Sequence, residues 1–363
     1  AKGLLPDPSK LLASFASAFE QSARLIRVDV PGMASNTLLP HRLTGHEAIN
    51  GTFHYELEVL SSDAFIELKS LIGVPVLVEI LTDKGITRPI AGLVTGAEQL
   101  GSDGGFASYK LIIESALAPL ALRRTWRVFM GLSSLDVVQK ILQEHRDANP
   151  VLAACLDVNV RVQEPPPARD FILQAGESDL DFIRRLLARE GLSCVIEPSP
   201  ESSADHPMHV LVIFEDTLDL DRSEAGTVRF HRANGTEASD TITQWTGHRT
   251  LQSGATTRGG WDHASGGVAS STEQTFADQG EGGNALASTL EDYHYHAGLE
   301  GQDPDAFSAL TRKRMQAREG WTKRFEGMGT VRAFRAGTWF SLAEHPLHDQ
   351  DRDFVITRLE VEA

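Results

Sequence analysis

The side chains that could do chemistry in this chain are its 13 histidines, its two cysteines and its 50 acidic residues. Three histidine pairs are close in sequence: His206 and His209, His294 and His296, and His345 and His348. A protein metal site needs three or four ligands at characteristic spacings, and none of these pairs has its remaining ligands at such a spacing. We interpret the pairs as surface or turn residues and predict no metal site.

The tripeptide Glu177-Ser178-Asp179 places a hydroxyl between two acids, as a nucleophilic site would. The sequence contains neither the GxSxG turn nor a histidine beside it, so helix capping explains Ser178 better. The many carboxylates would allow a glycosidase pair, but nothing singles one pair out. The stretch from Gly259 to Gly267 lacks the GK[ST] ending of a phosphate-binding loop. We predict no catalytic residue, no cofactor and no enzymatic activity.

The cysteines and tryptophans are better explained by packing than by chemistry. Cys155 and Cys194 lie far apart in apolar surroundings, which predicts buried, inert thiols made in a reducing compartment. The tryptophans are too scattered to form a stacking platform for nucleic acid, and we expect core or interface anchors. They are Trp126, Trp245, Trp261, Trp321 and Trp339.

Composition excludes several classes of protein. Hydrophobic residues make up 41% of the chain and charged residues 23%, which is ordinary for a soluble globular protein. The net charge of −16 disfavours nucleic-acid binding, which needs a basic surface, and docking on anionic membranes. Since no apolar run approaches the roughly 18 residues of a membrane span, we predict no stable membrane insertion.

The N-terminal stretch from Leu11 to Phe19 follows two lysines and contains Ala16-Ser17-Ala18, as a secretory signal peptide would. However, the apolar run before that tripeptide is short, and Asp7 interrupts the basic region. We predict no signal peptide and interpret this stretch as a helix or an ordered leader.

The elements that would position any site change along the chain. From Leu25 to about Leu117, closely spaced turns such as Asn50-Gly51 predict antiparallel strands. Apolar residues at helical spacing from Ser133 to His145 predict a helix, which strands follow. The glycine-, serine- and threonine-rich stretch 254–287 predicts a long excursion or a partly mobile loop, and 304–321 a helix. The stretches 330–337, 338–346 and 353–363 predict closing strands.

An internal echo suggests two similar β modules. A strand, a turn and a returning strand begin at Gly73, and the same layout begins again at Gly337. A constant offset aligns three pairs of residues: Gly73 with Gly337, Arg88 with Arg352, and Ile90 with Phe354.

The stretch from Gln174 to Gly191 predicts an amphipathic helix that carries no chemistry. Ser178 or Asp179 can cap its N-terminus, and Asp181 three residues after Ser178 makes a weaker capping box. Asp181 and Arg185 are spaced for an ion pair, and Gly191 stands where a left-handed stop belongs. The apolar side that it would bury consists of Leu180, Phe182, Ile183, Leu186 and Leu187.

The order of segments resembles the VgrG family, the trimeric spike-hub proteins of bacterial type VI secretion, whose hub half is similar to the baseplate hub of contractile phage tails. The resemblance spans roughly Leu25 to Ala363, through 43–62, 71–80, 88–98, 109–142, 171–198 and 354–363. The segment 171–198 is the most specific. The residues that fall on the family pattern, as structural signature residues, are Gln174, Glu177, Ser178, Asp179, Leu180, Phe182, Arg185, Leu186, Leu187, Glu190 and Gly191.

The resemblance implies an α+β, mainly β fold with two similar antiparallel β-barrel-like hub modules and α/β insertions. It implies that the chain ends before the OB-fold and β-helical needle of the family, so that it is truncated or a hub-only member. The expected parts are a leader (1–24), a first hub module (25–125), an α/β insert (126–205) and a second hub module (206–363), with a loop and helix insertion at about 254–320.

The resemblance also implies a mechanism and partners. A homotrimer with two β modules per chain would present six modules to the hexameric Hcp tube, and would thereby match three-fold to six-fold symmetry. Baseplate components would be further partners, and effectors or a tip protein would attach through the missing C-terminal part. The protein would assemble in the bacterial cytoplasm and then be secreted by the type VI system.

Two alternatives stay open from the sequence. The first is a hub protein of a phage or phage-like tail, which neighbouring genes would separate from a secretion spike. The second is a secreted hydrolase, which would require acids, bases or metal ligands gathered in a cleft.

Overall fold

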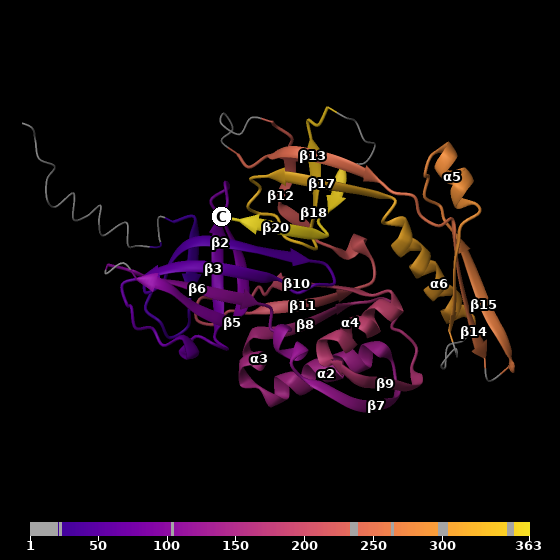
Figure 1. The fold of residues 1–363 in the computed structure, drawn as a ribbon, viewed down its shortest axis with the longest axis horizontal. Coiled ribbons are helices and arrows are strands. Elements are labelled where there is room, and N and C mark those ends of the chain that lie inside the picture. The colour runs from indigo at the N-terminus through magenta and orange to yellow at the C-terminus, as the bar shows by residue number, and fades with distance from the viewer. Residues whose placement is uncertain are drawn as a thin grey trace, which may run out of the picture.

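The computed structural model describes residues 21, 24–102, 105–232, 239–262, 265–296, 304–346 and 352–363, and the statements below concern these residues. The predicted leader up to residue 20 and His348 lie outside them. The described chain is mainly β (Figure 1). Two of its long helices lie in one layer, and the longest helix belongs to an arm that projects from the body. This confirms the predicted α+β, mainly β fold class.

The N-terminal part forms a curled, antiparallel seven-stranded sheet in the order β1-β4-β5-β6-β3-β2-β20 (Figure 1). Alternating buried residues on β3 and β6 give the sheet one apolar side, because successive strand residues point to opposite faces. The predicted hairpin turn joins β2 to β3, and Asn50 there has a left-handed backbone with φ of 60°. The strands are β1 (Ile26–Asp29), β2 (Leu39–Ala48), β3 (His54–Ser61), β4 (Pro75–Leu81), β5 (Thr87–Ser102), β6 (Ala107–Glu114) and β20 (Arg358–Glu362).

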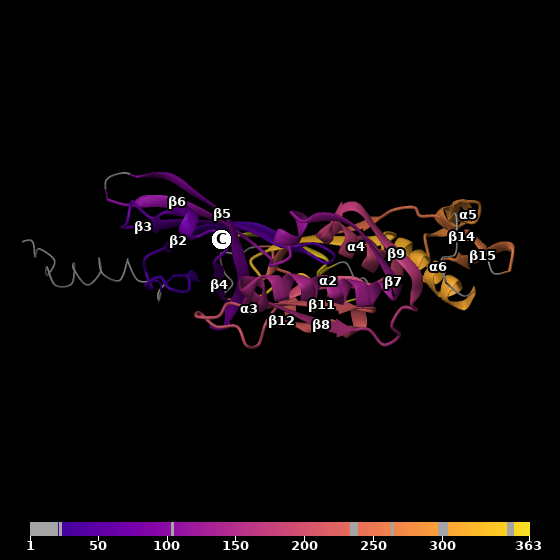
Figure 2. The same cartoon turned by 90° about the horizontal axis from the view of Figure 1, so that it is seen from below.

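An α/β layer lies against this sheet (Figures 1 and 2). Its three-stranded sheet has the order β10-β11-β8, and the ribbon β7–β9 is a separate two-stranded sheet. One hydrophobic core unites the helices with both sheets. The strands are β7 (Arg124–Leu132), β8 (Leu156–Arg161), β9 (Arg169–Ser178), β10 (Ser193–Pro198) and β11 (His209–Phe214). The helices are α2 (Ser134–Ala148), α3 (Pro150–Cys155) and α4 (Asp179–Glu190), with the 3-10 turns Leu68–Ser70, Ala118–Ala121 and Thr217–Asp219 elsewhere.

The C-terminal part builds two small sheets, one of β12, β18 and β19 and one of β13 and β17. Their shared core is aromatic: the ring of Trp245 stacks on Phe325 with centroids 5.5 Å apart and meets Phe354 edge-on at 4.8 Å. The predicted strand 330–337 is wrong, because this stretch forms turns in which Arg332 binds Asp240 through two nitrogens. The strands are β12 (Arg222–Arg229), β13 (Ile242–Arg249), β17 (Lys323–Gly329), β18 (Trp339–Ala343) and β19 (Asp353–Val355).

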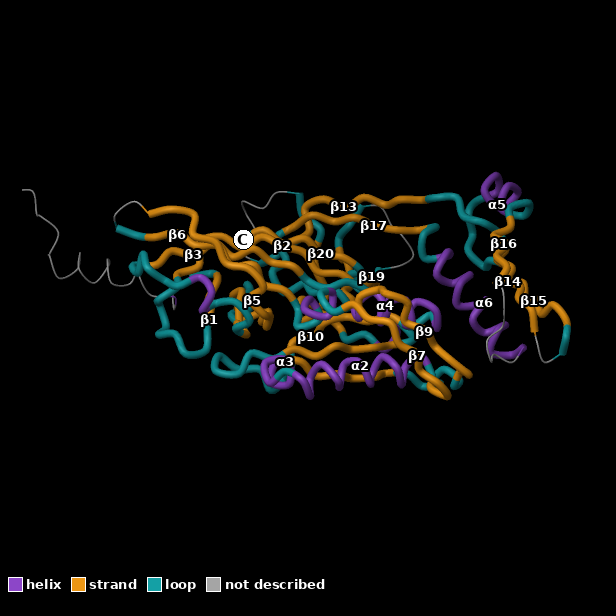
Figure 3. Tube along the Cα trace, turned by 60° about the horizontal axis from the view of Figure 1, so that its bottom comes forward, coloured by secondary structure: helices purple, strands orange, loops and turns teal. Residues whose placement is uncertain are grey.

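The stretch 254–287 belongs to a projecting arm, as the predicted excursion has it (Figure 1). It forms strands and a helix, so the alternative prediction of a loop is wrong. The sheet of the arm has the order β15-β14-β16, and α6 packs on the side of the sheet that faces the body (Figures 1 and 3). The strands contain few large apolar residues because their inner side meets α6 through small ones, such as Ser271 at Ser308. The elements are β14 (Ala255–Asp262), β15 (Gly267–Gln274), α5 (Glu281–Ala287), β16 (Glu291–His296) and α6 (Pro304–Glu319).

The two hairpins of the internal echo begin with the same backbone geometry. Gly73 and Gly337 both have a left-handed backbone, with φ of 78° and 77°. The Gly73 N–H donates to the carbonyl of Val94, and the Gly337 N–H to that of Ile356, each at 2.8 Å. In return, the N–H of Val94 donates to Val74 and that of Ile356 to Thr338, at 3.0 and 2.9 Å.

The constant offset of the echo does not hold on the returning strand. Val76 pairs with Gly92 in the first hairpin, and its counterpart Phe340 pairs with Phe354 in the second. Phe354 therefore corresponds to Gly92 rather than to Ile90, because the second hairpin returns two residues earlier. Arg352 is displaced from Arg88 in the same way.

Polar contacts join the N-terminal sheet to the C-terminal part. The buried Arg88 donates to Glu47 at 2.7 Å and to the Tyr55 hydroxyl at 3.1 Å, and Glu47 also accepts from the Ala336 N–H at 3.0 Å. Strand β20, near the end of the chain, pairs with β2 of the first sheet. The predicted domain boundaries stay predictions, although β20 shows that the N-terminal sheet draws on both ends of the chain.

His209 makes the seam between the N-terminal sheet and the α/β layer sensitive to pH. Its imidazole is buried, its Nε2 accepts from the Ala116 N–H at 3.0 Å, and burial lowers its pKa to about 4. An unfolded histidine has a pKa near 6.5, so the stability is fully present above that pH and is lost as the pH falls toward 4. We expect a loss of about 3 kcal/mol across this window, measured by urea unfolding at successive pH values.

The variant His209→Gln keeps an acceptor for Ala116 but cannot titrate. The difference between the wild-type and His209→Gln pH profiles isolates this residue from the other titrating groups. If the free energies of unfolding of the wild type and of His209→Gln change in parallel between pH 6.5 and 4, His209 is not the source of the pH dependence.

Candidate functional site

The most specific segment of the sequence forms the end of β9 and the whole of α4. Gln174 lies in the strand, and the helix begins after Ser178, whose hydroxyl accepts from the Asp181 N–H at 3.1 Å. Gly191 ends the helix with φ of 68°, as predicted for a left-handed stop. The side buried against the core consists of Leu180, Phe182, Ile183, Leu186 and Leu187.

Arg185 does not pair with Asp181 as the helical spacing predicted. The Asp181 carboxylate instead accepts from the Ser178 hydroxyl at 2.6 Å and completes the cap. Arg185 turns back to Glu177, with a nitrogen–oxygen distance of 2.5 Å, and to the Leu173 carbonyl at 2.8 Å. Because the Ser178 hydroxyl engages the Asp181 carboxylate, Arg185 pairs instead with Glu177 in the strand that precedes the helix.

Asp179 is the centre of a buried charge cluster, although it stands at the first turn of a helix. Its side chain is fully buried, and it accepts from Gln174 at 2.8 Å and from His145 Nε2 at 2.7 Å. Arg123 and Arg127 reach it at 2.5 and 3.2 Å. Since an ionised carboxylate only accepts, the His145 Nε2 carries a hydrogen.

Glu144 completes this cluster from α2. It accepts from Arg123 at 3.0 Å and from Arg127 at 2.6 Å, so that two carboxylates face two guanidinium groups. Burial alone would raise the pKa of Asp179 and of Glu144, but the hydrogen bonds and positive charges of these partners lower both below their usual values. The cluster is therefore a closed network of charges rather than a reactive acid.

A second buried ion pair lies at the other end of α4. The guanidinium of Arg169, which is fully buried, donates to Glu190 at 2.7 Å, and the Ser134 hydroxyl donates to the same oxygen at 2.6 Å. The Nε and Nη1 atoms of Arg169 meet no acceptor within the described residues. This pair ties the start of β9 to the end of α4 and to the first turn of α2.

Sequence reasoning found Gln174, Asp179 and Glu190 but not their partners. The missing partners lie 21 to 56 residues away along the chain, so no local spacing connects them. The signal in the sequence was the pair Arg123 and Arg127, whose guanidinium groups need acidic partners where they are partly buried. All eleven signature residues lie in this scaffold, and none of them is brought together with a nucleophile and a base.

Gly191→Ala is expected to lower the free energy of unfolding by about 1–2 kcal/mol, since a left-handed backbone is unfavourable for alanine. The added Cβ would also lie 2.8 Å from the Lys313 side chain on α6. Gly226→Ala is the matched control, because Gly226 has the same φ of 68° and open space around it. Urea unfolding should show a larger loss at 191, and equal losses would refute the contact with α6.

The outer side of the β7–β9 ribbon is apolar and uncovered. We name this surface the ribbon face. It consists of Trp126, Val128, Met130, Phe171 and Leu173. Trp126 and Met130 are 73% and 76% exposed, whereas the inner residues Phe129 and Ile172 are buried against the helices. An uncovered apolar sheet face is typical of a protein–protein interface.

The histidines and cysteines that the structure describes do not gather into a chemical site. Among the described residues, no three His, Cys, Asp or Glu side chains gather as metal ligands would. His206 is exposed, whereas His209 is buried at the seam described above. Cys155 and Cys194 are both buried and unpaired, and burial raises the pKa of each thiol to about 11. Within the described ranges, no helix is long and apolar enough to cross a membrane.

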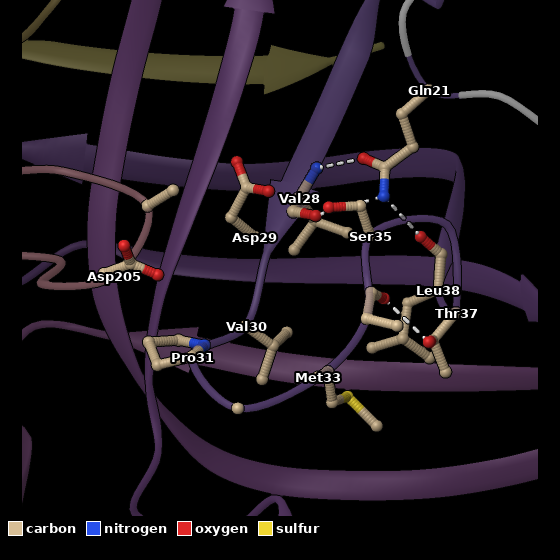
Figure 4. A pocket seen from close by; sticks show the side chains of 13 residues that line it. Gln21, Val28, Asp29, Val30, Pro31, Met33, Ser35, Thr37, Leu38 and Asp205 are labelled. Atoms are coloured by element: carbon tan, nitrogen blue, oxygen red, sulfur yellow. Dashed lines mark hydrogen bonds between the residues drawn. The ribbon is translucent and has the colours of Figure 1, made fainter.

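A half-open pocket of about 100 Å³ lies beside β1 (Figure 4). Asp29 and Asp205 face it, and burial together with the nearby charge of Glu79 raises the pKa of Asp29. The Gln21 side chain closes one end by binding the backbone of Val28 and Leu38. The hydroxyls of Ser35 and Thr37 also line the pocket, but among the described residues no base and no set of three metal ligands is gathered there, so the lining defines no reaction.

Comparison with known proteins identifies the family of this chain. The family model described as "Phage tail baseplate hub (GPD)" matches residues 46–363. The type VI secretion system spike protein VgrG1a of Pseudomonas aeruginosa is 25% identical over 346 residues, which cover 94% of this chain and 50% of the relative. The chain thus spans about half the length of that relative.

Two solved structures share the fold. The Escherichia coli c3393 protein, a type VI secretion component with structural similarity to the T4 tail proteins gp27 and gp5, matches with a TM-score of 0.66 and 18% identity. The match covers 93% of this chain and 73% of the other. A 43 kDa tail protein of prophage MuSo2 from Shewanella oneidensis matches with a TM-score of 0.55 and 14% identity, over 93% of each chain.

These matches agree with a structure in which the signature segment forms a buried scaffold and the ribbon face is apolar and exposed. The family model accounts for most of the chain, from the second strand of the N-terminal sheet to the last residue. The chain belongs to the phage tail baseplate hub family.

Proposed function

We propose that this protein is the structural hub of a three-fold type VI secretion spike, which closes the end of a six-fold Hcp tube. The observation that carries the proposal is the repeated hairpin, in which Gly73 and Gly337 share a left-handed backbone and the same pair of hydrogen bonds. Two similar β modules in one chain become six in a trimer, and six modules can match a hexameric ring.

The open edges of the sheets support this proposal. Among the described residues, β1 and β20 are the two end strands of the seven-stranded sheet. At β1 the Gln21 side chain already binds the N–H and the C=O of Val28, so β20 is the edge that supports the proposal. Edge strands have unpaired N–H and C=O groups that can pair with another chain. Assembly through such edges and through apolar faces requires no catalytic group.

The proposed partners follow from this role. Three copies form the spike, the Hcp hexamer docks on the six modules, and baseplate components surround the hub. Effectors or a tip protein attach through the sequence that continues the family beyond the hub. The protein assembles in the cytoplasm and leaves the cell with the spike.

The test is to measure the mass of the full chain in solution and its binding to purified hexameric rings. Sedimentation equilibrium should give three times the chain mass, and the particle should bind Hcp rings with one trimer per ring face. A monomer at every concentration would overturn the three-fold hub. Binding to phage tube rings but not to Hcp rings would assign the hub to a phage-like tail instead.

A further inference from the structure

A second uncovered apolar face lies on the arm, on the side of the sheet turned away from α6 and from the body (Figures 1 and 3). We name it the arm face. It consists of Trp261, Val268, Tyr293 and Tyr295. Val268 and Tyr293 are 60% and 58% exposed, and Trp261 pairs directly with Val268 across the sheet. The inner side is engaged instead, through contacts such as that of Asp292 with Arg318 at 2.7 Å.

The ribbon face is a continuous surface made of cross-strand pairs. Val128 lies opposite Leu173, and Met130 lies opposite Phe171. An aromatic side chain buries about 150–250 Å² when enclosed and the aliphatic ones somewhat less, so the exposed fractions leave on the order of 500 Å² of apolar surface. A stable interface buries about 800 Å² per partner, and the ribbon face supplies most of one side of it.

The two faces carry opposite charges at their margins. Arg124 is exposed on the outer side of β7 and meets no carboxylate in the described part of the chain. Glu291 is exposed on the outer side of β16, where it accepts from the Thr257 hydroxyl and meets no cation among the described residues. Two copies of one face would juxtapose like charges, whereas one face against the other pairs Arg124 with Glu291.

Side-chain chemistry also matches across the two faces. The ribbon face offers Met130 beside aromatic and aliphatic side chains, and the arm face offers three aromatic rings beside Val268. A thioether against an aromatic ring is a favourable contact. Since the chain carries a net charge of −16, its copies repel one another unless specific apolar and charge contacts bring them together.

We propose that the ribbon face of one copy docks on the arm face of the next copy of this chain. Two different faces on one chain make a head-to-tail contact, and three such contacts close a ring. The inference rests on the proposed three-fold hub and names the residues through which its copies meet.

The test uses two charge insertions at exposed positions of the full chain. Met130→Asp disables the ribbon face, and Val268→Asp disables the arm face. Phe65→Asp is the matched control, because Phe65 is 92% exposed outside both faces. Each of the two variants should weaken association by at least about thirtyfold, as expected for central interface residues, while circular dichroism and the behaviour of the control stay unchanged.

Mixing the two variants gives the decisive result. The intact arm face of Met130→Asp can still meet the intact ribbon face of Val268→Asp, so the mixture should form a dimer and stop there. A second pair of variants tests the charges: Arg124→Glu and Glu291→Arg should each weaken association, and the double variant should restore it.

Each outcome separates the inference from the proposed function. A wild-type trimer with variants that still trimerise would overturn the pairing of these faces but leave the three-fold hub standing. Monomeric variants that form no mixed dimer would show that the faces contact other surfaces, and would also overturn the pairing. A wild-type chain that stays monomeric would overturn the hub proposal itself.

Discussion

Replacing Asp179 with alanine is expected to lower the free energy of unfolding by about 3–5 kcal/mol, the range for breaking a buried ion pair. The change leaves Arg123 and Arg127 facing Glu144 alone and removes the acceptor of the His145 hydrogen bond. Because the pKa of Asp179 is held below its usual value, the carboxylate is charged at neutral pH and the full loss should appear there. Urea unfolding at pH 7 measures it.

Two further variants show whether the loss comes from the charge. Asp179→Asn keeps the size of the side chain but removes the charge, and should lose more than half of the stability lost by the alanine variant. Asp170→Ala, at an exposed acid in the same strand, should change the free energy of unfolding by no more than about 0.5 kcal/mol. A loss in Asp179→Ala no larger than that of Asp170→Ala would contradict the buried cluster.

Arg169→Met is expected to be as damaging, with a loss of about 3–5 kcal/mol, because it leaves the Glu190 carboxylate buried without its cation. Methionine fills most of the volume of arginine, so the loss reports on charge rather than on a cavity. Thermal and urea unfolding of the same variant should agree.

The double variant Arg169→Met/Glu190→Leu tests the cause directly. A buried pair can often be replaced by apolar residues of similar size at little cost, so most of the lost stability should return. The unsatisfied Nε and Nη1 atoms of Arg169 strengthen this expectation, since the wild-type pair is incompletely hydrogen-bonded among the described residues. A double variant as unstable as the single one would show that Arg169 acts through other contacts.

Local features of the signature segment were predictable from the sequence. The cap at Ser178, the apolar side of α4 and the left-handed Gly191 all depend on residues within a few positions of one another. The partner of Arg185 was not predictable in the same way. Spacing allowed Asp181, but the capping hydrogen bond from Ser178 had already engaged that carboxylate.

Features that depend on distant parts of the chain could not be predicted. Strand β20 pairs with β2 across the whole length of the chain, and β14 and β15 contain too few large apolar residues to resemble strands. The second hairpin returns two residues earlier than the first, so an alignment at a constant sequence offset matches the wrong residues on the returning strands. Pairing partners are set by tertiary packing, and local propensity does not encode them.

The exposed apolar faces could be predicted only in part from the sequence. Trp126 and Trp261 were expected as core or interface anchors, and each lies on an exposed apolar face of a small sheet. The charged residues of α4 serve to hold the ribbon β7–β9 against the helices, so the ribbon face is presented rigidly. The buried scaffold and the exposed ribbon face are therefore two sides of the same ribbon.

The most direct test of the three-fold hub is electron cryo-microscopy of the full chain viewed along its symmetry axis. The predicted result is a ring of three chains in which six β modules, two from each chain, lie at one common radius. A ring of another order, or three chains whose second modules lie outside the ring, would contradict the symmetry-matching hub.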